Sequence, residues 1–258
     1  MRAESSAKAS GLSIFTSKFP IRGKALSSVG VLAAQVLNTL LPQDCLLCGA
    51  PSGERILCRP CQDDVPRLVT DLCPVCAQPC PGGSLCGECL RHPPHFDATL
   101  APFRYAFPAN KLIQALKFGH RLGLAPFLAE AMLQGLRPTA DLMIPMPLGP
   151  GRLRERGFNQ ALELARPLAR ALGLPLDLSI CQRRLDTLPQ SLLPWKERRK
   201  NIRHAFECLA DLDGKSVIVV DDVMTSGATL DELAATLKRH GAARVTNWVA
   251  ARALKGEP

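Results

Sequence analysis

The segment Ser216–Leu230, SVIVVDDVMTSGATL, constrains the fold of this 258-residue chain more than any other stretch. It opens with a run of β-branched apolar residues, Val217–Val220, that does not alternate with polar ones. Such a run is typical of a strand buried on both faces of a parallel sheet, because helices cover both faces of that kind of sheet. We therefore expect an α/β domain in which this strand is central.

Two carboxylates and a loop of small residues follow this strand directly. Asp221 and Asp222 come where the carboxyl end of the strand would meet the ligand-binding crevice of an open α/β sheet. The loop Thr225–Thr229 leads into a helix, and its Gly227 permits a positive φ and close approach of the backbone. The N–H groups and positive dipole end of that helix favour an anion such as phosphate. Acids for sugar hydroxyls or a metal, followed by a phosphate-binding loop, indicate a site for a phosphorylated sugar.

Other interpretations of this segment exist. An apolar strand ending in two aspartates also occurs in metal-binding nucleoside triphosphatases, and Ser or Thr before a helix often acts only as a cap. A Walker-type loop would need the pattern G-x-x-x-x-G-K-[ST], which occurs nowhere in this sequence. The helix after the loop should end near Gly241, and the next strand is expected at Val245–Ala250. The predicted core face of the helix after the loop consists of Leu230, Leu233, Ala234 and Leu237.

The strand, the two acids and the Thr/Ser-Gly-x-Thr loop resemble the signature with which type I phosphoribosyltransferases bind phosphoribosyl pyrophosphate (PRPP). Over roughly residues 36–253 the chain also resembles the ComF competence-protein family, in which a cysteine-rich zinc module precedes a phosphoribosyltransferase-like domain. The resemblance implies a type I phosphoribosyltransferase fold that binds PRPP with Mg²⁺. The motifs that carry it, besides the PRPP loop, are Ile144–Ala161 (IPMPLGPGRLRERGFNQA), Thr187 with Gln190, and Glu197–Phe206 (ERRKNIRHAF).

By this resemblance, Asp221 and Asp222 hold the ribose 2′- and 3′-hydroxyls, directly or through Mg²⁺. Magnesium and arginines neutralise the departing pyrophosphate. The expected catalytic residues are Asp221, Asp222, Arg198 and Arg199. No residue identifies the acceptor nucleophile, so enzymatic turnover stays an open question. The expected PRPP-binding residues are Lys117, Pro145, Met146, Pro147, Leu148, Arg156, Thr187, Gln190, Asp221, Asp222, Val223, Thr225, Ser226, Gly227, Ala228 and Thr229.

The stretch 183–206 is strongly basic, with seven Lys or Arg residues against only Asp186 and Glu197. The resemblance implies that Arg183–Asn201 closes over bound substrate and excludes water. A mobile basic loop without closure is the alternative. For the arginines of the GRLRERG stretch, a role in binding phosphate oxygens stands beside a simple solvated basic face.

Four C-x-x-C pairs between Cys45 and Cys89 form the second strong signal. Nine residues separate the two pairs within each half of this segment. Two C-x-x-C turns that share one centre complete a tetrahedral Zn–S₄ site. A disulfide framework is the rival interpretation, but nothing marks the chain as secreted, and the cytosol keeps thiols reduced. We expect one or two structural zinc ions in a double zinc ribbon, held by Cys45, Cys48, Cys58, Cys61, Cys73, Cys76, Cys86 and Cys89.

The sequence does not decide which pairs share a metal. Sequential pairing is simplest, whereas an interleaved arrangement would join the first pair to the third. We assign no role to Cys80 and expect Cys181 and Cys208 to be small apolar residues. His92 and His95 are expected to be linker residues in the stiff boundary HPPHF rather than metal ligands.

Several local elements are also expected. A helix should span Ala109–Phe118 and carry Lys117 to its end, and a strand should run through Asp141–Pro147. A second helix is expected to be kinked or broken at Pro167, because proline removes a helical hydrogen bond. An amphipathic helix is expected at about Ala25–Leu41. The apolar stripe of the Pro167 helix is predicted to be Phe158, Ala161, Leu162, Ala165, Ala169 and Leu172.

The expected organisation is a disordered leader over 1–28, a helix with the double zinc ribbon over 29–94, and the phosphoribosyltransferase-like domain over 95–258. No apolar run reaches the roughly 18 residues that a membrane span needs, so we expect a cytoplasmic protein without an integral membrane segment.

The formal net charge of +9 favours attraction to nucleic-acid backbones, even though two Zn–Cys₄ sites would lower it to about +5. The ComF resemblance implies a role in DNA uptake during natural transformation, with single-stranded DNA and the competence machinery as partners. The alternative is a catalytically silent phosphoribosyltransferase-fold protein that binds single-stranded DNA or senses PRPP.

Overall fold

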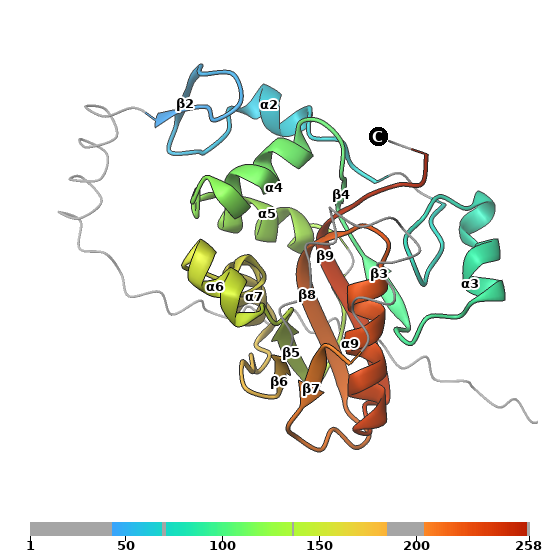
Figure 1. Ribbon diagram of the computed structural model, residues 1–258. Helices are drawn as coiled ribbons and strands as arrows, with labels where there is room; N and C mark the ends of the chain where they lie inside the picture. Colours follow the sequence, from blue (N-terminus) through green and yellow to red (C-terminus); the bar gives the residue numbers. More distant parts are fainter. Residues whose placement is uncertain (1–42, 69–70, 136, 185–203, 257–258) are drawn as a thin grey trace, which may run out of the picture. The chain divides into compact units, whose positions relative to one another are not determined.

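A computed structural model describes residues 43–68, 71–135, 137–184 and 204–256 (Figure 1). The expected helix at Ala25–Leu41 and most of the expected loop Arg183–Asn201 lie outside these ranges. A five-stranded sheet has the order β3-β9-β8-β5, and β4 pairs with β9 beyond the end of β3. All of its pairings are parallel. Its strands are β3 (Ala98–Leu100), β4 (Phe103–Arg104), β5 (Leu142–Pro145), β8 (Ser216–Met224) and β9 (Arg244–Arg252).

The strand β8 is central, as the sequence predicts. The side chains of Val217–Val220 are fully buried, and β8 pairs with β5 on one side and with β9 on the other. The strand continues through Asp221 and Asp222 to Met224, so both carboxylates belong to its carboxyl end rather than to the following loop. The expected strand Val245–Ala250 lies within β9.

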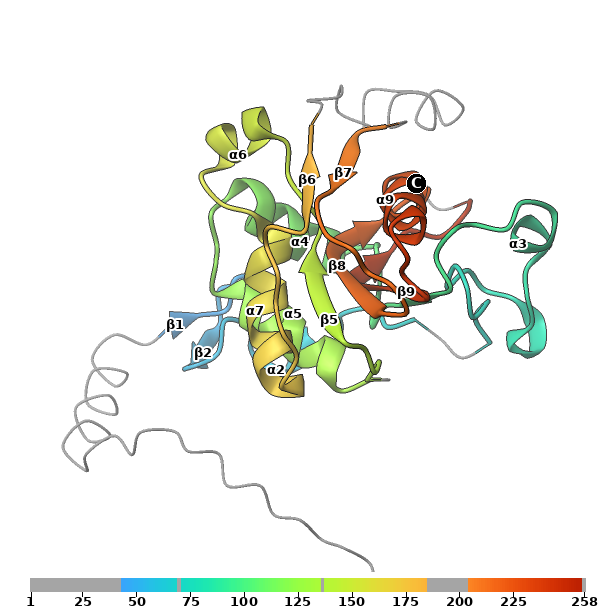
Figure 2. The ribbon, with the colours of Figure 1, turned by 90° about the horizontal axis from the view of Figure 1, so that it is seen from below.

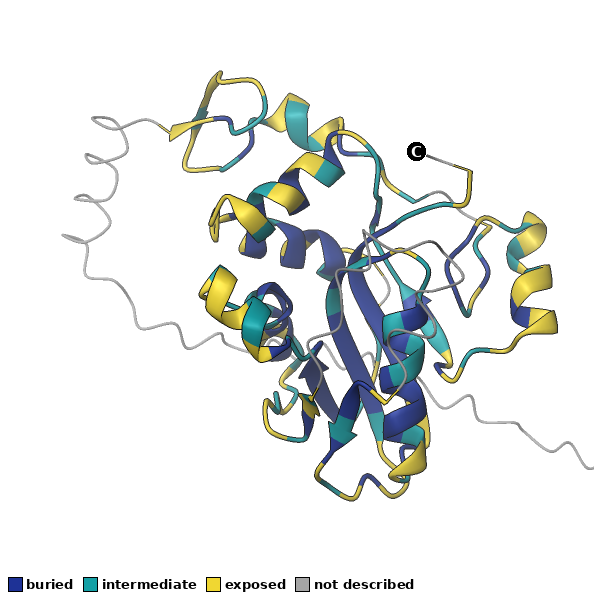
Figure 3. Cartoon of the chain, viewed as in Figure 1, coloured by how far each residue is buried: buried dark blue, intermediate teal, exposed yellow. Residues whose placement is uncertain are grey.

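Helices cover both faces of the sheet, as seen in Figures 1 and 2. On one face, Ile218 and Val220 pack in a core with α4 (Ala109–Phe118), α5 (Leu124–Leu133) and α7 (Gln160–Leu172). On the other face, Val217 and Val219 pack in a core with α9 (Ala228–Arg239). We refer to these as the α4 face and the α9 face. Burial follows this layering, with the strands and the inner sides of the helices buried (Figure 3).

The helix α4 has the predicted bounds, and α9 buries the predicted Leu230, Leu233, Ala234 and Leu237. The expected break at Pro167 is wrong, because α7 runs unbroken from Gln160 to Leu172. Its apolar side lies against α5, β5 and β8, and this packing outweighs the single hydrogen bond that proline removes. The buried residues of α7 include Leu164 and Leu168 in place of the predicted Leu162, which is half-buried.

The remaining elements are short. Two antiparallel pairs, β1–β2 and β6–β7, lie outside the main sheet. No helix in the described part of the chain is both long and apolar enough to cross a membrane. The short elements are β1 (Gln43–Asp44), β2 (Pro51–Gly53), α2 (Arg59–Asp63), a 3₁₀ turn (Pro81–Gly83), α3 (Gly87–Arg91), α6 (Pro150–Arg156), β6 (Cys181–Arg183) and β7 (Phe206–Cys208).

Candidate functional site

The cysteines of the four C-x-x-C pairs come together in two groups of four. Within each group, the sulfur atoms all lie within 4.8 Å of one another. Each group takes its members from two consecutive pairs, so the pairing is sequential and not interleaved. The first tetrad consists of Cys45, Cys48, Cys58 and Cys61, and the second tetrad consists of Cys73, Cys76, Cys86 and Cys89.

The two tetrads repeat the same backbone structure. In the first, the N–H of Gly49 donates to the carbonyl of Cys45 at 2.9 Å, and in the second the N–H of Ala77 donates to the carbonyl of Cys73 at 2.9 Å. Both of these donor residues have a positive φ, of 73° and 54° respectively. Cys58 and Cys86 occupy the N-cap positions of the short helices α2 and α3. Each half is therefore a complete zinc-ribbon turn.

The chemistry of the thiols fits a bound cation. Burial raises the pKa of Cys76 to about 11, and the neighbouring thiols of Cys86 and Cys73 oppose its ionisation further. Four thiolates so close together repel one another unless a cation compensates them. A tetrahedral set of four sulfurs is the preferred donor set of structural Zn²⁺, and it leaves no open position for a substrate. The two tetrads thus support structural zinc.

A buried ion pair joins Asp222 of β8 to Lys117 of α4. The Lys117 Nζ lies 2.9 Å from Asp222 Oδ2, and the Asp222 side chain is only 4% exposed. Burial alone would lower the pKa of Lys117, but the carboxylates of Asp222 and Asp221 outweigh burial and raise it. Lys117 is therefore a protonated cation at the carboxyl end of β8, where the sequence predicts a ligand crevice.

The neighbouring carboxyl group has a different environment. The Asp221 carboxyl group lies close enough to Asp222 and Lys117 for their charges to act on it. Its Oδ1 accepts a hydrogen bond of 2.8 Å from the Asp222 N–H. Burial raises the pKa of Asp221 to about 8, and the charge of Asp222 adds to this effect while Lys117 opposes it. A divalent cation or donating hydroxyl groups would favour the ionised form of this carboxyl group.

The loop Thr225–Thr229 connects β8 to α9. Gly227 has a φ of 81°, and a Cβ at this position would come within 2.6 Å of Met224 Cε. The positive φ favours glycine here, because L-residues with a side chain are strained in this conformation, whereas the Met224 methyl group could move aside. The helix α9 begins at Ala228, whose N–H donates to Ser226 Oγ at 3.3 Å. The loop therefore brings its backbone to the N-terminus of a 12-residue helix, an arrangement that favours bound phosphate.

The loop after β5 lies beside the same end of β8. Pro145 pairs with Val220 in the sheet, and the Met146 N–H donates to the Val220 carbonyl at 2.8 Å. Asn159 Nδ2 donates to the Met146 carbonyl at 3.1 Å and so fixes this turn to the start of α7. The structure thus brings the predicted segment Pro145–Leu148 next to the two acids.

Other predicted site residues differ in position. The Arg156 guanidinium lies over the Phe118 ring, 5.1 Å from its centroid, and so contacts the same end of α4 that carries Lys117. Thr187, Gln190, Arg198 and Arg199 lie outside the described residues.

Comparisons with known proteins add family information to this geometry. A phosphoribosyl transferase domain model matches residues 159–257, and a double zinc ribbon domain model matches residues 36–90. The chain is 35% identical over 225 residues to the DNA utilization protein YhgH of Escherichia coli O157:H7, covering 83% of this chain and 99% of that protein. The chain belongs to the ComF family.

Two other relatives of this ComF-family chain carry competence names. It is 32% identical to competence protein F of Haemophilus influenzae, over 65% of this chain and 78% of that protein. It is 26% identical to competence protein ComFC of Bacillus subtilis, over 81% of this chain and 94% of that protein. The expected fold, a type I phosphoribosyltransferase domain preceded by a double zinc ribbon, is confirmed.

One candidate functional residue belongs to none of the motifs in the sequence. Arg252, the last residue of β9, is buried, and its guanidinium contacts carbonyl groups of both the zinc module and the loop after β8. The only signal in the sequence is an arginine that directly follows the apolar run Trp248–Ala251. A cavity of about 960 Å³ adjoins it, and its lining includes Cys76, Cys86 and Cys89 of the second tetrad together with Ser226–Ala228 and Asp231.

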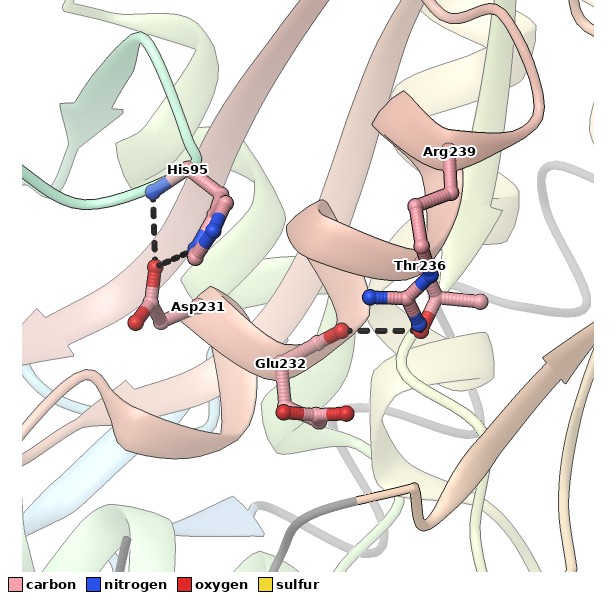
Figure 4. Close-up of polar contacts among 5 residues, drawn as sticks. All are labelled: His95, Asp231, Glu232, Thr236 and Arg239. Carbon is pink, nitrogen blue, oxygen red and sulfur yellow. Dashed lines mark hydrogen bonds and ion pairs between the residues drawn. The ribbon is translucent and has the colours of Figure 1, made fainter.

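The boundary segment HPPHF, which the sequence predicts to be a linker, is hydrogen-bonded to α9. The His95 N–H donates to Asp231 Oδ1 at 2.7 Å, and the His95 ring nitrogen Nδ1 lies 3.0 Å from the same oxygen (Figure 4). One turn further along, Thr236 Oγ1 donates to the Glu232 carbonyl and accepts from Arg239 Nη2 (Figure 4). The bonds from His95 to Asp231 therefore attach the segment before the phosphoribosyltransferase domain to α9.

Proposed function

We propose that this ComF-family protein binds PRPP with Mg²⁺ at the carboxyl end of β8. The observation that carries the proposal is the buried ion pair between Lys117 and Asp222, which lies directly before the Gly227 loop. A buried ion pair often stabilises a fold no better than apolar side chains of the same size, so the position of this pair at the carboxyl end of the central strand favours a binding role.

In this proposal each part of the site has its own contact with the substrate. Backbone N–H groups of Thr225–Thr229 donate to the 5′-phosphate at the start of α9. Asp221 and Asp222 accept hydrogen bonds from the ribose 2′- and 3′-hydroxyls. The segment Pro145–Leu148 contributes backbone groups to the pyrophosphate, and Lys117 adds positive charge. Arg156, Thr187 and Gln190 complete the proposed set.

Magnesium fits the donor set, because Asp221 and Asp222 supply the carboxylate oxygens that this ion prefers alongside substrate phosphates. When bound, the ion would supply charge neutralisation for the pyrophosphate group. Arg198 and Arg199 are the proposed catalytic cations of the chain itself. We place transfer of the phosphoribosyl group to an acceptor as the next step to test once binding is established.

The relatives extend the proposal to a biological role. Their names refer to DNA utilization and to competence. We propose that this protein acts in the uptake or use of DNA in the cytoplasm, and that its sugar-phosphate site serves that role.

The experiment is a calorimetric titration of the zinc-loaded full-length protein with PRPP and Mg²⁺. We expect saturable binding that weakens at least tenfold in Asp222→Asn. The matched control is Asp141→Asn, because Asp141 accepts from the Ser216 N–H at 2.7 Å at the opposite end of β8. Binding that is equally reduced by both variants, or no binding by the folded wild type, would contradict the proposal.

A second candidate function is binding of single-stranded DNA by a phosphoribosyltransferase-fold protein without turnover. The net charge of +9 favours it. Fluorescence anisotropy with a labelled oligonucleotide at rising salt concentration distinguishes the two. A steep fall of affinity with salt, unaffected by Asp222→Asn, is the expected result for this second function.

A further inference from the structure

Arg252 is an unusual residue for the end of a central strand. It is only 3% exposed, and the arginines of folded proteins are almost never buried without partners. Burial lowers the pKa of its guanidinium, while the thiols of the second tetrad oppose that fall. An arginine in this position therefore needs several acceptors, and these acceptors belong to two different parts of the chain.

The first group of acceptors ties Arg252 to the second tetrad. Its Nε donates to the carbonyl of Cys76, a member of that tetrad, at 2.7 Å. Gln78 strengthens this junction, because its Nε2 donates to the Ala253 carbonyl at 2.9 Å and its Oε1 accepts from the Lys255 N–H at 3.1 Å. The turn that carries the second tetrad is thus bonded to the end of β9.

The second group of acceptors ties Arg252 to the loop proposed to bind phosphate. Its Nη1 donates to the Met224 carbonyl at 2.9 Å and to the Thr225 carbonyl, and also to the carbonyl of Ala253 at 2.7 Å. Peptide groups are planar, so fixing the carbonyls of Met224 and Thr225 also fixes the directions of the N–H groups of Thr225 and Ser226. These N–H groups begin the loop Thr225–Thr229.

The first tetrad packs against the other face of the sheet, away from this loop. Cys45 packs in the core of the α4 face together with Leu57, whereas Cys73, Cys76 and Cys89 pack in the core of the α9 face with Met224 and Ala228. Two metal sites of the same construction are therefore coupled to different parts of the domain.

We propose that Arg252 is a positioning residue that holds the loop Thr225–Thr229 against the second tetrad, so that zinc at the second tetrad, and not at the first, sets the loop's conformation and its affinity for a sugar phosphate. The ligand named here rests on the proposed function, but the effect on the loop does not. Zinc fixes the turn around Cys76. Without the ion, the Cys76 carbonyl leaves its position, and Arg252 loses the bond that orients it toward Met224 and Thr225.

The test uses the full-length protein with a matched pair of ligand substitutions. Cys86→Ser removes a ligand of the second tetrad, and Cys58→Ser removes the equivalent ligand of the first, since both residues are half-buried N-caps. Arg252→Lys keeps the charge but cannot reach both groups of carbonyls. Gln78→Met is the control for docking of the ribbon alone. Zinc content is measured for every variant.

Two measurements are made on each protein. The first is hydrogen exchange of peptides covering residues 221–232 without ligand, and the second is the dissociation constant for PRPP with Mg²⁺. We expect Cys86→Ser and Arg252→Lys to speed exchange of this peptide and to weaken PRPP binding at least tenfold. Cys58→Ser should stay within threefold of the wild type in both, and Gln78→Met should have a smaller effect than Arg252→Lys because it leaves the bonds of Arg252 in place. Arg252→Lys should keep two zinc ions per chain, which separates positioning of the loop from loss of metal.

The results that would overturn the proposal are equally definite. Equal effects of Cys58→Ser and Cys86→Ser on the 221–232 peptide would show that the two tetrads act only through general stability. Unchanged exchange in a folded Cys86→Ser protein would contradict coupling even if Arg252→Lys fails to fold. If the wild type does not bind PRPP, the proposed function fails, whereas the exchange data still decide the role of Arg252.

Discussion

The two zinc-ribbon turns have the same cysteine spacing and the same backbone hydrogen bonds, yet they lie in different surroundings. The second tetrad has three buried cysteines and contacts the α9 face, where the loop after β8 begins. The first tetrad has one buried cysteine, and it contacts the α4 face. Two copies of one motif can therefore contact different backbone groups of a domain, because each copy packs against a different face of the sheet.

The faces of the sheet differ in their charged groups as well. On the α4 face, Lys117 and Asp222 form a buried pair that connects α4 to β8. On the α9 face, Arg252 uses main-chain carbonyls as acceptors and connects β9 to the loop and to the second tetrad. Substitutions on each face should therefore have separable effects.

The largest expected effect is on the α4 face. Lys117→Met leaves the Asp222 carboxylate buried without its cation and should lower the free energy of unfolding by about 3 kcal/mol. The control on the other helix is Lys238→Met, because Lys238 Nζ bonds Asp97 Oδ2 at 2.8 Å in a more exposed pair. That variant should cost less than about 1 kcal/mol. Urea unfolding of both proteins measures the difference, and equal losses would contradict this assignment.

A smaller effect concerns Asp221 and depends on pH. The pKa of Asp221 is about 8 in the folded protein, above its value in the unfolded chain. At a pH between the two pKa values, the folded state keeps a proton on this carboxyl group that the unfolded state has lost. Wild-type stability should therefore fall as the pH rises from 6 to 8, by roughly 2 kcal/mol at most. Asp221→Asn should remove this dependence. Thermal unfolding without Mg²⁺ at both pH values tests it, and parallel curves for the two proteins would refute the shift.

Zinc exchange should distinguish the tetrads directly. Cys48 in the first tetrad is exposed, whereas its counterpart Cys76 in the second is buried. A chromogenic chelator should therefore remove zinc in two phases, with the faster phase about tenfold quicker, a difference of roughly 1.4 kcal/mol in the barrier. Cys58→Ser should abolish the fast phase and leave the slow one. A single phase, or loss of the slow phase in this variant, would reverse the ranking.

The smallest expected effect exploits equivalent turn positions. Gly49 and Ala77 both have positive φ, which costs an L-residue about 1 kcal/mol. A Cβ at position 49 would meet no atom within 4 Å, so the positive φ is the main cost of Gly49→Ala. This substitution should therefore destabilise the first ribbon by roughly 1 kcal/mol. Ala77→Gly should change stability less, because relief of strain is offset by loss of a buried methyl group. Differential scanning calorimetry of the zinc-loaded proteins can resolve both changes.

The sequence predicted the parts of this structure that depend on local pattern. The apolar run of β8, the helix Ala109–Phe118 and the positive φ of Gly227 all follow from residues close together in the chain. The C-x-x-C spacing predicted the tetrads but not their sequential pairing, which depends on tertiary folding.

Features that depend on packing were not predictable. The continuous α7 results from burial of its apolar side, which no propensity for Pro167 reveals. The role of Arg252 requires knowing that residues 76, 224 and 252 lie together in space. The attachment of His95 to Asp231 likewise joins residues 136 positions apart.

The most direct test of the central claim is a phosphorus NMR titration of PRPP, in the presence of Mg²⁺, with the zinc-loaded protein and with Gly227→Ala. We predict that the resonance of the 5′-phosphate shifts or broadens on addition of wild-type protein, because the loop Thr225–Thr229 holds that group. In Gly227→Ala the alanine would be strained at the φ of 81°, so the loop should change conformation and this effect should be lost while the protein stays folded. A 5′-phosphate resonance that does not respond to the wild type, or responds equally to both proteins, would contradict the account.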